Sequence, residues 1–237
     1  MSDSAEAERV LVVTAHPDDV DFGAAGTVAS WAAQGLDVTY CIVTDGDAGG
    51  FDPSVPRSEI AGIRRAEQTA AAKAVGVTQL EFLGYPDGRL TPSIELRRDI
   101  SRVIRQVRPE RVVCQSPERN YGRIFASHPD HLAAGEAALC AVYPDSRNPF
   151  AHPELAAEGL EAHSVPEVWM MGAPNFDVYV DITEHFDAKI EALLCHVSQH
   201  AQPENLEPMI RGWTTATAAA GGLPEGRLAE GFMRIRT

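Results

Sequence analysis

Two short clusters of histidine and aspartate have the residue types and spacing for metal chemistry. Residues 16–19 read His-Pro-Asp-Asp, and residues 128–131 read His-Pro-Asp-His. A proline is tolerated in the first turn of a helix, so side chains three positions apart in each cluster can face the same way. Each cluster can therefore direct two polar groups at one point.

Zinc coordination is the chemistry that these residue types favour. Two imidazoles and one carboxylate form a common zinc ligand set, and a catalytic zinc keeps its fourth position for a water molecule, whose pKa falls toward about 7. The candidate ligands are His16, Asp19 and His131. Zinc, or another divalent ion in its place, is the expected cofactor.

The other ionisable residues of the two clusters remain beside such a metal. Asp18 is then a candidate general base, and His128 is a candidate general acid. Asp130 can orient His128 and stabilise its positive charge. Taken alone, each His-Pro-Asp string is explained by a capped turn at the start of a helix. The two strings together, both near strand ends, favour a metal-assisted active site.

Strand-like and helix-like segments alternate around these clusters. The apolar run at 10–15 ends at the first cluster and fits a strand buried on both faces. The alternation predicts an α/β fold with a mostly parallel sheet covered by helices, whose ligands sit outside the carboxyl ends of the strands. The predicted strands are 10–15, 37–44, 79–83 and 111–114, and the predicted helices are 24–33, 58–75, 93–107 and 129–142.

The C-terminal third adds extra strands and helices. We expect strands at 168–171 and 178–182, and helices at 184–200 and 204–220. No repeat, low-complexity tract or change in composition marks a linker. The sequence therefore predicts a single domain over residues 1–237.

Composition and charge disfavour several classes of protein. The chain has 20 basic and 34 acidic residues, a formal net charge of −14. Such a charge repels phosphate backbones and anionic lipid headgroups, so neither nucleic acid nor a membrane is an expected partner. The four cysteines lie far apart and are expected to be reduced thiols. The N-terminus is acidic and its apolar stretch at 10–15 is too short for export, so we expect a cytoplasmic protein.

The motifs resemble those of the zinc-dependent N-acetylglucosaminyl-phosphatidylinositol deacetylase family, also called PIG-L or LmbE-like. Its hallmark is Ala-His-Pro-Asp-Asp after the first strand, followed by an acidic residue and a Gly-rich turn, with a later His-Pro-Asp-His. The resemblance covers most of residues 10–142. The matching stretches are AHPDDVDFGAAGT at 15–27, TDGDAGG at 44–50, Arg64 with Glu67, FLGYPDGRL at 82–90 and SHPDH at 127–131.

This resemblance implies a Rossmann-like domain with helices on both faces of the sheet, which holds zinc through the three candidate ligands. It implies that Asp18 is the general base and that His128 stabilises the oxyanion or protonates the amine. It also implies that Arg64 and Asp87 bind polar groups of the substrate. From the residues alone, Arg64 is explained by a surface ion pair with Glu67, and Asp87 by a Pro-Asp-Gly turn.

The leading interpretation is a metal-dependent hydrolase. It removes an N-acyl group, taken to be acetyl, from an amino-sugar-containing small molecule by zinc-activated water. The amide chemistry is argued from the site, whereas the sugar comes only from the resemblance. One alternative is an amidase of a thiol conjugate of an amino sugar, and another is a non-catalytic Rossmann-like binding module. A homo-oligomer is compatible with the sequence.

Overall fold

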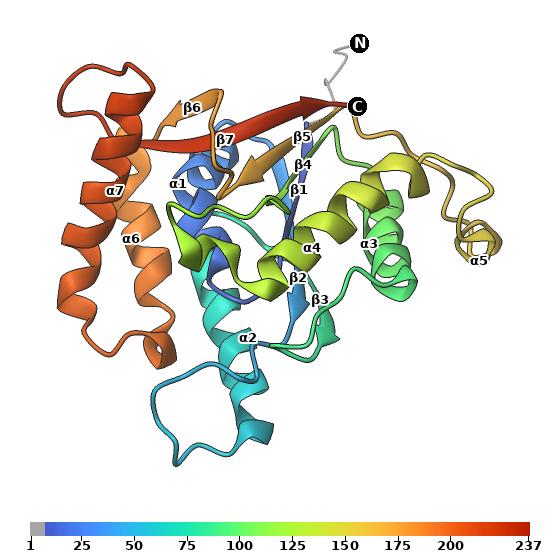
Figure 1. The fold of residues 1–237 in the computed structure, drawn as a ribbon, viewed down its shortest axis with the longest axis horizontal. Coiled ribbons are helices and arrows are strands. Elements are labelled where there is room, and N and C mark those ends of the chain that lie inside the picture. Colours follow the sequence, from blue (N-terminus) through green and yellow to red (C-terminus); the bar gives the residue numbers. More distant parts are fainter. Residues whose placement is uncertain (1–7) are drawn as a thin grey trace, which may run out of the picture.

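A seven-stranded mixed sheet forms the centre of the molecule (Figure 1). The computed structural model describes residues 8–237. Five neighbouring strands run parallel, and β7 joins their edge antiparallel to both β5 and β6. The strand order is β3-β2-β1-β4-β5-β7-β6, formed by β1 (Arg9–Thr14), β2 (Asp37–Thr44), β3 (Gln79–Tyr85), β4 (Arg111–Gln115), β5 (Glu167–Met171), β6 (Val178–Asp181) and β7 (Ala229–Arg236).

Helices connect the strands and cover both faces of the sheet, as Figure 1 shows. The mostly parallel, Rossmann-like arrangement predicted from the sequence is confirmed. The helices are α1 (Asp19–Ala33), α2 (Arg57–Ala74), α3 (Ile94–Val107), α4 (Pro129–Cys140), α5 (Pro153–Ala157), α6 (Phe186–Leu194) and α7 (Leu206–Ala220), with short 3-10 turns that include η1 (Ile124–Ser127).

Alternate side chains of β1 pack into different apolar layers. Leu11 and Val13 contribute to the layer beneath α3 and α4. Val10 and Val12 contribute to the opposite layer, which α1, α2 and α6 cover. Successive side chains of a strand point to opposite faces, so a strand buried on both faces reads as a continuous apolar run. This arrangement fixes the end of β1 rigidly beneath the first His-Pro-Asp-Asp cluster.

Several elements differ from the predictions, and helix α5 was not predicted. Helix α1 begins at Asp19 rather than at residue 24, because the first cluster leads directly into its first turn. Helix α6 ends at Leu194 rather than at residue 200, since the chain leaves helical geometry at His196, whose side chain is buried. Strand β7 was not predicted, because Glu230 and Gly231 interrupt its apolar pattern.

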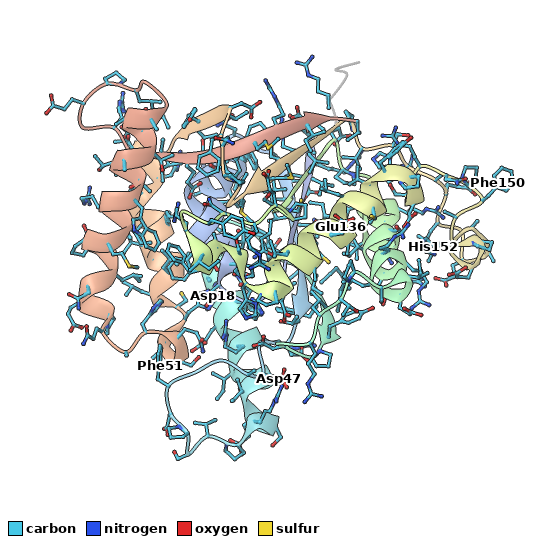
Figure 2. All side chains as sticks on the ribbon, in the orientation of Figure 1. Asp18, Asp47, Phe51, Glu136, Phe150 and His152 are labelled. Atoms are coloured by element: carbon cyan, nitrogen blue, oxygen red, sulfur yellow. The ribbon has the colours of Figure 1, made fainter. Side chains whose placement is uncertain are left out.

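Two strongly exposed aromatic side chains lie far apart. Phe51 is 66% exposed and Phe150 is 89% exposed, and Figure 2 shows them well separated on the molecule. Within residues 8–237, no helix combines the length and the apolar character needed to cross a bilayer. Part of the prediction about the N-terminus rests on the acidic residues at 1–7. These residues lie outside the part of the chain that the structure describes.

Glycine at position 135 allows α4 to approach the end of β4. A Cβ atom there would overlap the backbone carbonyl oxygen of Gln115 and lie 3.0 Å from Pro117 N. Gly135 follows His131 by about one helical turn, so this close approach also sets the distance of the second cluster from the sheet.

We expect Gly135→Ala to lower the free energy of unfolding by about 1–3 kcal/mol, because the added methyl group meets backbone atoms that cannot give way. Gly212→Ala is the matched control, since Gly212 lies in α7 with nothing within 4 Å of its Cβ position. That control should gain up to about 1 kcal/mol through helix propensity. Urea denaturation measures both changes, and a stabilised Gly135→Ala variant would contradict the packing described.

Candidate active site

The first cluster occupies the turn between β1 and α1. The backbone N–H of His16 donates to Asp19 Oδ2 at 2.7 Å. Asp18 adopts a left-handed conformation, with φ 90° and ψ −25°, which costs a residue other than glycine about 1 kcal/mol. Its backbone N–H donates to Gln68 Oε1 at 2.7 Å, and this bond offsets the strain. The turn thereby holds His16 and Asp19 together at the carboxyl end of β1.

The second cluster opens α4. Pro129 occupies the start of that helix, and the ring Nδ1 of its N-cap residue, His128, accepts the backbone N–H of Asp130 at 3.2 Å. At the end of β4, Gln115 Oε1 accepts the backbone N–H of Ala15 at 2.9 Å. Since β1 and β4 are adjacent parallel strands, both clusters lie at the same edge of the sheet.

Three side chains from the two clusters converge on one point. His16 Nδ1 lies 3.2 Å from His131 Nε2 and 3.3 Å from Asp19 Oδ2. His131 Nε2 lies 3.0 Å from Asp19 Oδ1. A tetrahedral cation with ligands at about 2.0–2.1 Å separates those ligands by about 3.3 Å. The donor set predicted from the sequence therefore has the spacing that a small divalent cation requires.

Two carboxylates face the other nitrogen of His16. Its Nε2 lies 3.0 Å from Asp87 Oδ1 and 3.4 Å from Asp130 Oδ2. Burial alone would lower the pKa of His16, but Asp19, Asp130 and Asp87 raise it to about 12. Carboxylates on the far nitrogen of a metal-binding histidine fix its orientation and increase its basicity. The surroundings of His16 therefore favour positive charge, as a cation site requires.

The contacts of Asp130 differ from the sequence prediction that it orients His128. Its carboxylate accepts the backbone N–H groups of Gly88 at 2.7 Å and Leu90 at 3.2 Å, and it faces His16. Only its backbone N–H contacts the His128 ring. The sequence pattern could not show whether the Asp130 carboxylate faces His128 or His16, because the turn at 86–90 that binds this carboxylate is distant in the chain.

Arg64 lies inside the protein rather than on its surface. Its guanidinium donates to Pro17 O, and Nη2 lies 3.1 Å from Asp18 Oδ2. Glu67 instead accepts the backbone N–H of Ser198 at 2.7 Å and its hydroxyl at 2.8 Å. The prediction that Arg64 forms a surface ion pair with Glu67 is therefore wrong. Burial raises the pKa of Asp18 to about 7, although the charge of Arg64 acts to lower it.

His128 is exposed and lies beside the two histidine ligands. Its ring centroid is 5.0 Å from that of His16 and 5.4 Å from that of His131. Because Nδ1 accepts a hydrogen bond, the neutral ring carries its proton on Nε2. Burial and the positive charges of His16 and His131 lower the pKa of His128. The ring is therefore a neutral hydrogen-bond donor near pH 7.

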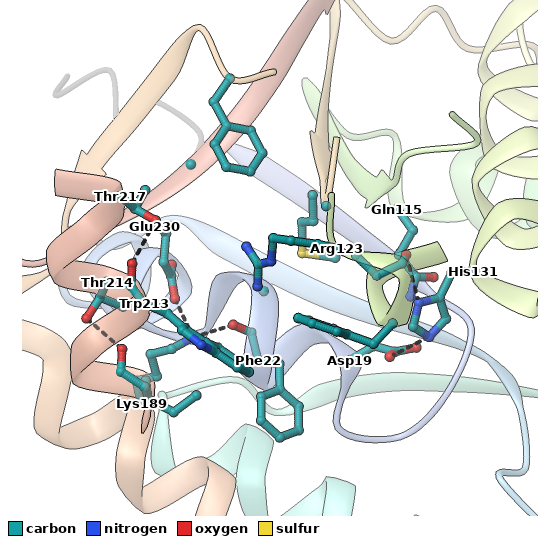
Figure 3. Close-up of a pocket in the computed structure, with 18 of the residues that line it drawn as sticks. Asp19, Phe22, Gln115, Arg123, His131, Lys189, Trp213, Thr214, Thr217 and Glu230 are labelled. Atoms are coloured by element: carbon teal, nitrogen blue, oxygen red, sulfur yellow. Dashed lines mark hydrogen bonds and ion pairs between the residues drawn. The ribbon is translucent and has the colours of Figure 1, made fainter. Parts of the chain in front are cut away.

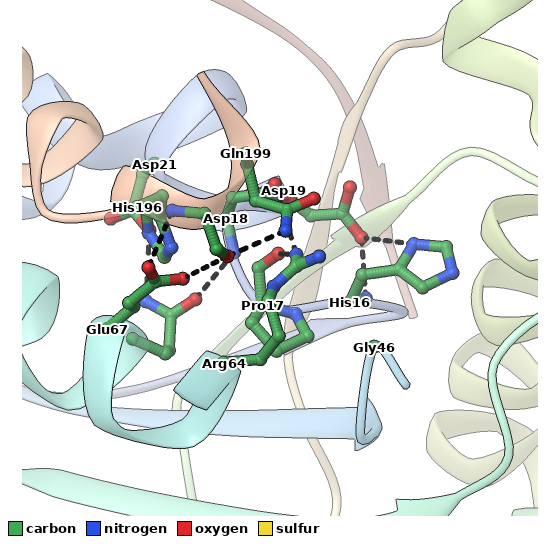
Figure 4. A network of polar contacts seen from close by, with 12 residues as sticks. His16, Pro17, Asp18, Asp19, Asp21, Gly46, Arg64, Glu67, His196 and Gln199 are labelled. Carbon is green, nitrogen blue, oxygen red and sulfur yellow. Dashed lines mark hydrogen bonds and ion pairs between the residues drawn. The ribbon is translucent and has the colours of Figure 1, made fainter. Parts of the chain in front are cut away.

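A buried polar chain, which the sequence analysis did not find, reaches the backbone of Asp18 (Figure 4). His196 Nε2 lies 2.8 Å from Asp21 Oδ2, and both side chains are fully buried. Gln68 donates to the same Asp21 oxygen at 2.9 Å and accepts the N–H of Asp18. Asp21 follows the first cluster by two residues, but its partner His196 is 175 positions away, so no local signal joins them.

A cavity of about 360 Å³ opens onto the metal centre (Figure 3). Asp18, Asp19 and His131 line one end, and α7, β7 and η1 supply other walls. The carbon-rich part of its lining includes Phe22, Phe125, Met171, Phe176, Ile210 and Trp213. The site therefore joins a candidate cation to a pocket with room for a small organic molecule.

The family model described as GlcNAc-PI de-N-acetylase matches residues 11–142, more than half of the chain. This chain belongs to the PIG-L family. PIG-L deacetylases are metal-dependent. This agrees with the side chains gathered at the site, where His16 with His128 and His131, and His16 with Asp87 and Asp130, are also close enough to hold an ion. Helices α6 and α7, which complete the cavity and the buried chain, follow the stretch that the PIG-L model matches.

Relatives of this PIG-L chain extend the likeness beyond that stretch. Diacetylchitobiose deacetylase of Thermococcus kodakarensis is 32% identical over 229 residues, which cover 96% of this chain and 83% of that protein. The probable N-acetyl-alpha-D-glucosaminyl L-malate deacetylase 2 of Bacillus cereus is 34% identical over 217 residues, covering 88% and 92%. The structure of N,N'-diacetylchitobiose deacetylase from Pyrococcus horikoshii matches with a TM-score of 0.89 and 31% identity, covering 98% of this chain and 85% of that chain.

We expect His131→Ala to weaken binding of a divalent cation by about 100-fold or more, because it removes one of three ligands. The measurement is calorimetric titration of Zn²⁺ into chelator-treated protein. His185→Ala serves as the control, since His185 follows β6 and is not among the residues that line the cavity. Unchanged Zn²⁺ affinity in His131→Ala would refute this ligand set.

His196→Ala should lower the free energy of unfolding by about 2 kcal/mol or more, because it leaves the Asp21 carboxylate buried without its imidazole partner. Urea denaturation of His196→Ala and of the His185→Ala control provides the comparison. Equal stability of the two variants would show that the buried pair contributes nothing.

Proposed function

We propose that this chain is a metal-dependent N-deacetylase that hydrolyses the acetamido group of an amino-sugar-containing small molecule, with zinc as its cation. The observation that carries the proposal is the triangle of His16 Nδ1, Asp19 and His131 Nε2, with edges of 3.0–3.3 Å, beside Asp18 at the end of a cavity. A non-catalytic binding module has no need of a cation site that opens onto a buried carboxylate.

Zinc suits the donor set of two imidazole nitrogens and one carboxylate, which other divalent ions of the first transition series also accept. When bound, the cation supplies Lewis acidity toward the amide carbonyl and toward water. Asp87 and Asp130 hold the His16 ring so that Nδ1 faces the cation position.

Asp18 is the general base in this proposal. Its carboxylate removes a proton from the attacking water, and the water oxygen forms a bond to the amide carbon. A base acts best when its pKa lies near the working pH, and burial raises the pKa of Asp18 to about 7. Arg64 and Gln68 hold Asp18 in place through its side chain and its backbone N–H.

His128 stabilises the negative charge that develops on the amide oxygen. Its Nε2–H donates a hydrogen bond to that oxygen, an interaction worth about 3–4 kcal/mol when it is preorganised. The C–N bond then breaks, and the proton held by Asp18 passes to the leaving nitrogen. The products are acetate and a free amine.

The substrate class is supported by the names of the relatives, which are deacetylases of diacetylchitobiose and, probably, of N-acetylglucosaminyl malate. Direct contact of the substrate with Arg64 and Asp87 stays a prediction, since the contacts of these residues are with Asp18 and His16. An amidase of a thiol conjugate would use the same catalytic groups, so the two activities are separated by substrate.

We expect the purified protein to release primary amine from N-acetylated amino sugars, and to lose this activity on chelation and regain it when Zn²⁺ is added.

Asp18→Asn should lower kcat by about 10³-fold, because it removes the base. Asp181→Asn is the matched control, an identical change at an exposed carboxylate. A fluorogenic amine assay measures both. Full activity after chelation, or in Asp18→Asn, would overturn the mechanism.

A further inference from the structure

One arginine and two stacked aromatic rings line the cavity that opens onto the metal centre. Figure 3 shows Arg123 and Trp213 on the side of the cavity away from His131. The rings of Phe125 and Trp213 have centroids 5.9 Å apart and planes inclined by 17°. The guanidinium carbon of Arg123 lies 5.2 Å from the first centroid and 5.3 Å from the second. These cation–π contacts restrain a planar, five-donor group, although the Arg123 and Phe125 side chains remain exposed. We name Arg123, Phe125 and Trp213 the Arg123 subsite.

The N–H donors of Arg123 are available to a ligand. Within residues 8–237, the guanidinium makes no hydrogen bond or ion pair with a protein group. The other cationic side chain of the cavity lining, Lys189, is already satisfied, because its Nζ donates to Glu230 Oε1, Asp21 O and Phe22 O at 2.7 Å each. Of the arginine and lysine side chains in the lining, Arg123 is therefore the one whose N–H donors are left for a bound molecule.

Among the described residues, no carboxylate forms an ion pair with Arg123, a property that it shares with several other arginines of this acidic chain, Arg119 and Arg236 among them. The protein has 34 acidic residues against 20 basic ones, and carboxylates pair with the arginines at 64, 65 and 97. Burial lowers the pKa of Arg123, the direction expected for a cation without an acidic neighbour. The acidic groups of the cavity lining lie elsewhere, Asp18 and Asp19 with the metal centre and Glu230 in an ion pair with Lys189.

The size of the cavity leaves room beyond the reacting group. Its volume of about 360 Å³ is in the range of small-molecule sites. If the acetamido group lies at the metal end, the rest of the substrate extends along the apolar wall toward Arg123. The group attached to the anomeric carbon of the sugar, the aglycone, is the part able to reach it.

We propose that the Arg123 subsite recognises a carboxylate or phosphate on the aglycone, so that the preferred substrate is an anionic conjugate of an N-acetylated amino sugar. This inference rests on the proposed function. Guanidinium binds carboxylate and phosphate alike through paired, charge-assisted hydrogen bonds. The aromatic faces of Phe125 and Trp213 contact the carbon atoms of the same conjugate.

The test compares anionic with neutral substrates. N-acetylglucosaminyl malate supplies a carboxylate, N-acetylglucosamine 1-phosphate supplies a phosphate, and diacetylchitobiose is neutral. We expect the wild-type protein to give a higher kcat/KM for an anionic substrate than for diacetylchitobiose. Arg123→Gln should lower the ratio of kcat/KM for the anionic substrate to kcat/KM for diacetylchitobiose by about tenfold or more. This is the loss expected for a charge-assisted hydrogen bond. Which anion gives the higher value identifies the acid group that the subsite takes.

Two further variants distinguish recognition from unspecific effects. Arg123→Lys keeps the charge but loses the paired donors, so it should recover only part of the ratio. Arg236→Gln makes the same change of net charge at an exposed position near the end of β7 and should leave the ratio unchanged. A wild-type ratio at or below one, or an equal ratio in Arg123→Gln, would overturn the subsite while leaving deacetylation intact.

Binding provides a second readout that does not depend on turnover. Calorimetry with N-acetylglucosaminyl malate, N-acetylglucosamine 1-phosphate and diacetylchitobiose measures affinity in the wild type and in Arg123→Gln. Loss of anion preference in the variant supports the subsite even if no amine is released, an outcome that would defeat only the proposed function. Equal affinities of the two proteins for the anionic compounds would overturn the subsite.

Discussion

His16 Nδ1 and His131 Nε2 lie 3.2 Å apart at the carboxyl ends of β1 and β4, and each lies within 3.3 Å of one oxygen of the Asp19 carboxylate. Two imidazoles and a carboxylate are stable at that spacing when positive charge lies between them, because the lone pairs of the ligands otherwise repel. Nearby carboxylates raise the pKa of His16 to about 12, against the effect of burial. The site thus attracts positive charge, which a divalent cation provides.

The segment beyond residue 142 completes this site. The buried His196 reaches Asp21, which shares Gln68 with the backbone of Asp18. Lys189 joins α6 to Glu230 of β7 and to backbone carbonyls of α1. Loss of these contacts would free the left-handed turn at Asp18 to relax, because its strain persists only where the surroundings hold it. The C-terminal helices therefore support the catalytic geometry as well as forming the cavity.

The sequence predicted those parts of the fold and site that local patterns encode. The alternation of strand-like and helix-like segments was sufficient to predict the mostly parallel sheet. The two His-Pro-Asp strings near strand ends were sufficient to predict that His16, Asp19 and His131 lie together. What it could not predict depends on partners distant in the chain. Arg64 was interpreted as a surface residue because its partner Asp18 belongs to another element. Residues 196–200 follow a helical pattern, but burial of His196 against Asp21 ends α6 early.

Binding of one divalent cation between the two strand ends can be seen by anomalous diffraction from crystals grown with Zn²⁺. We expect one strong anomalous peak per chain, about 2.0–2.2 Å from His16 Nδ1, an Asp19 carboxylate oxygen and His131 Nε2. A peak on the other side of the His16 ring, between Asp87 and Asp130, would contradict it, as would a chain without any peak at this edge of the sheet.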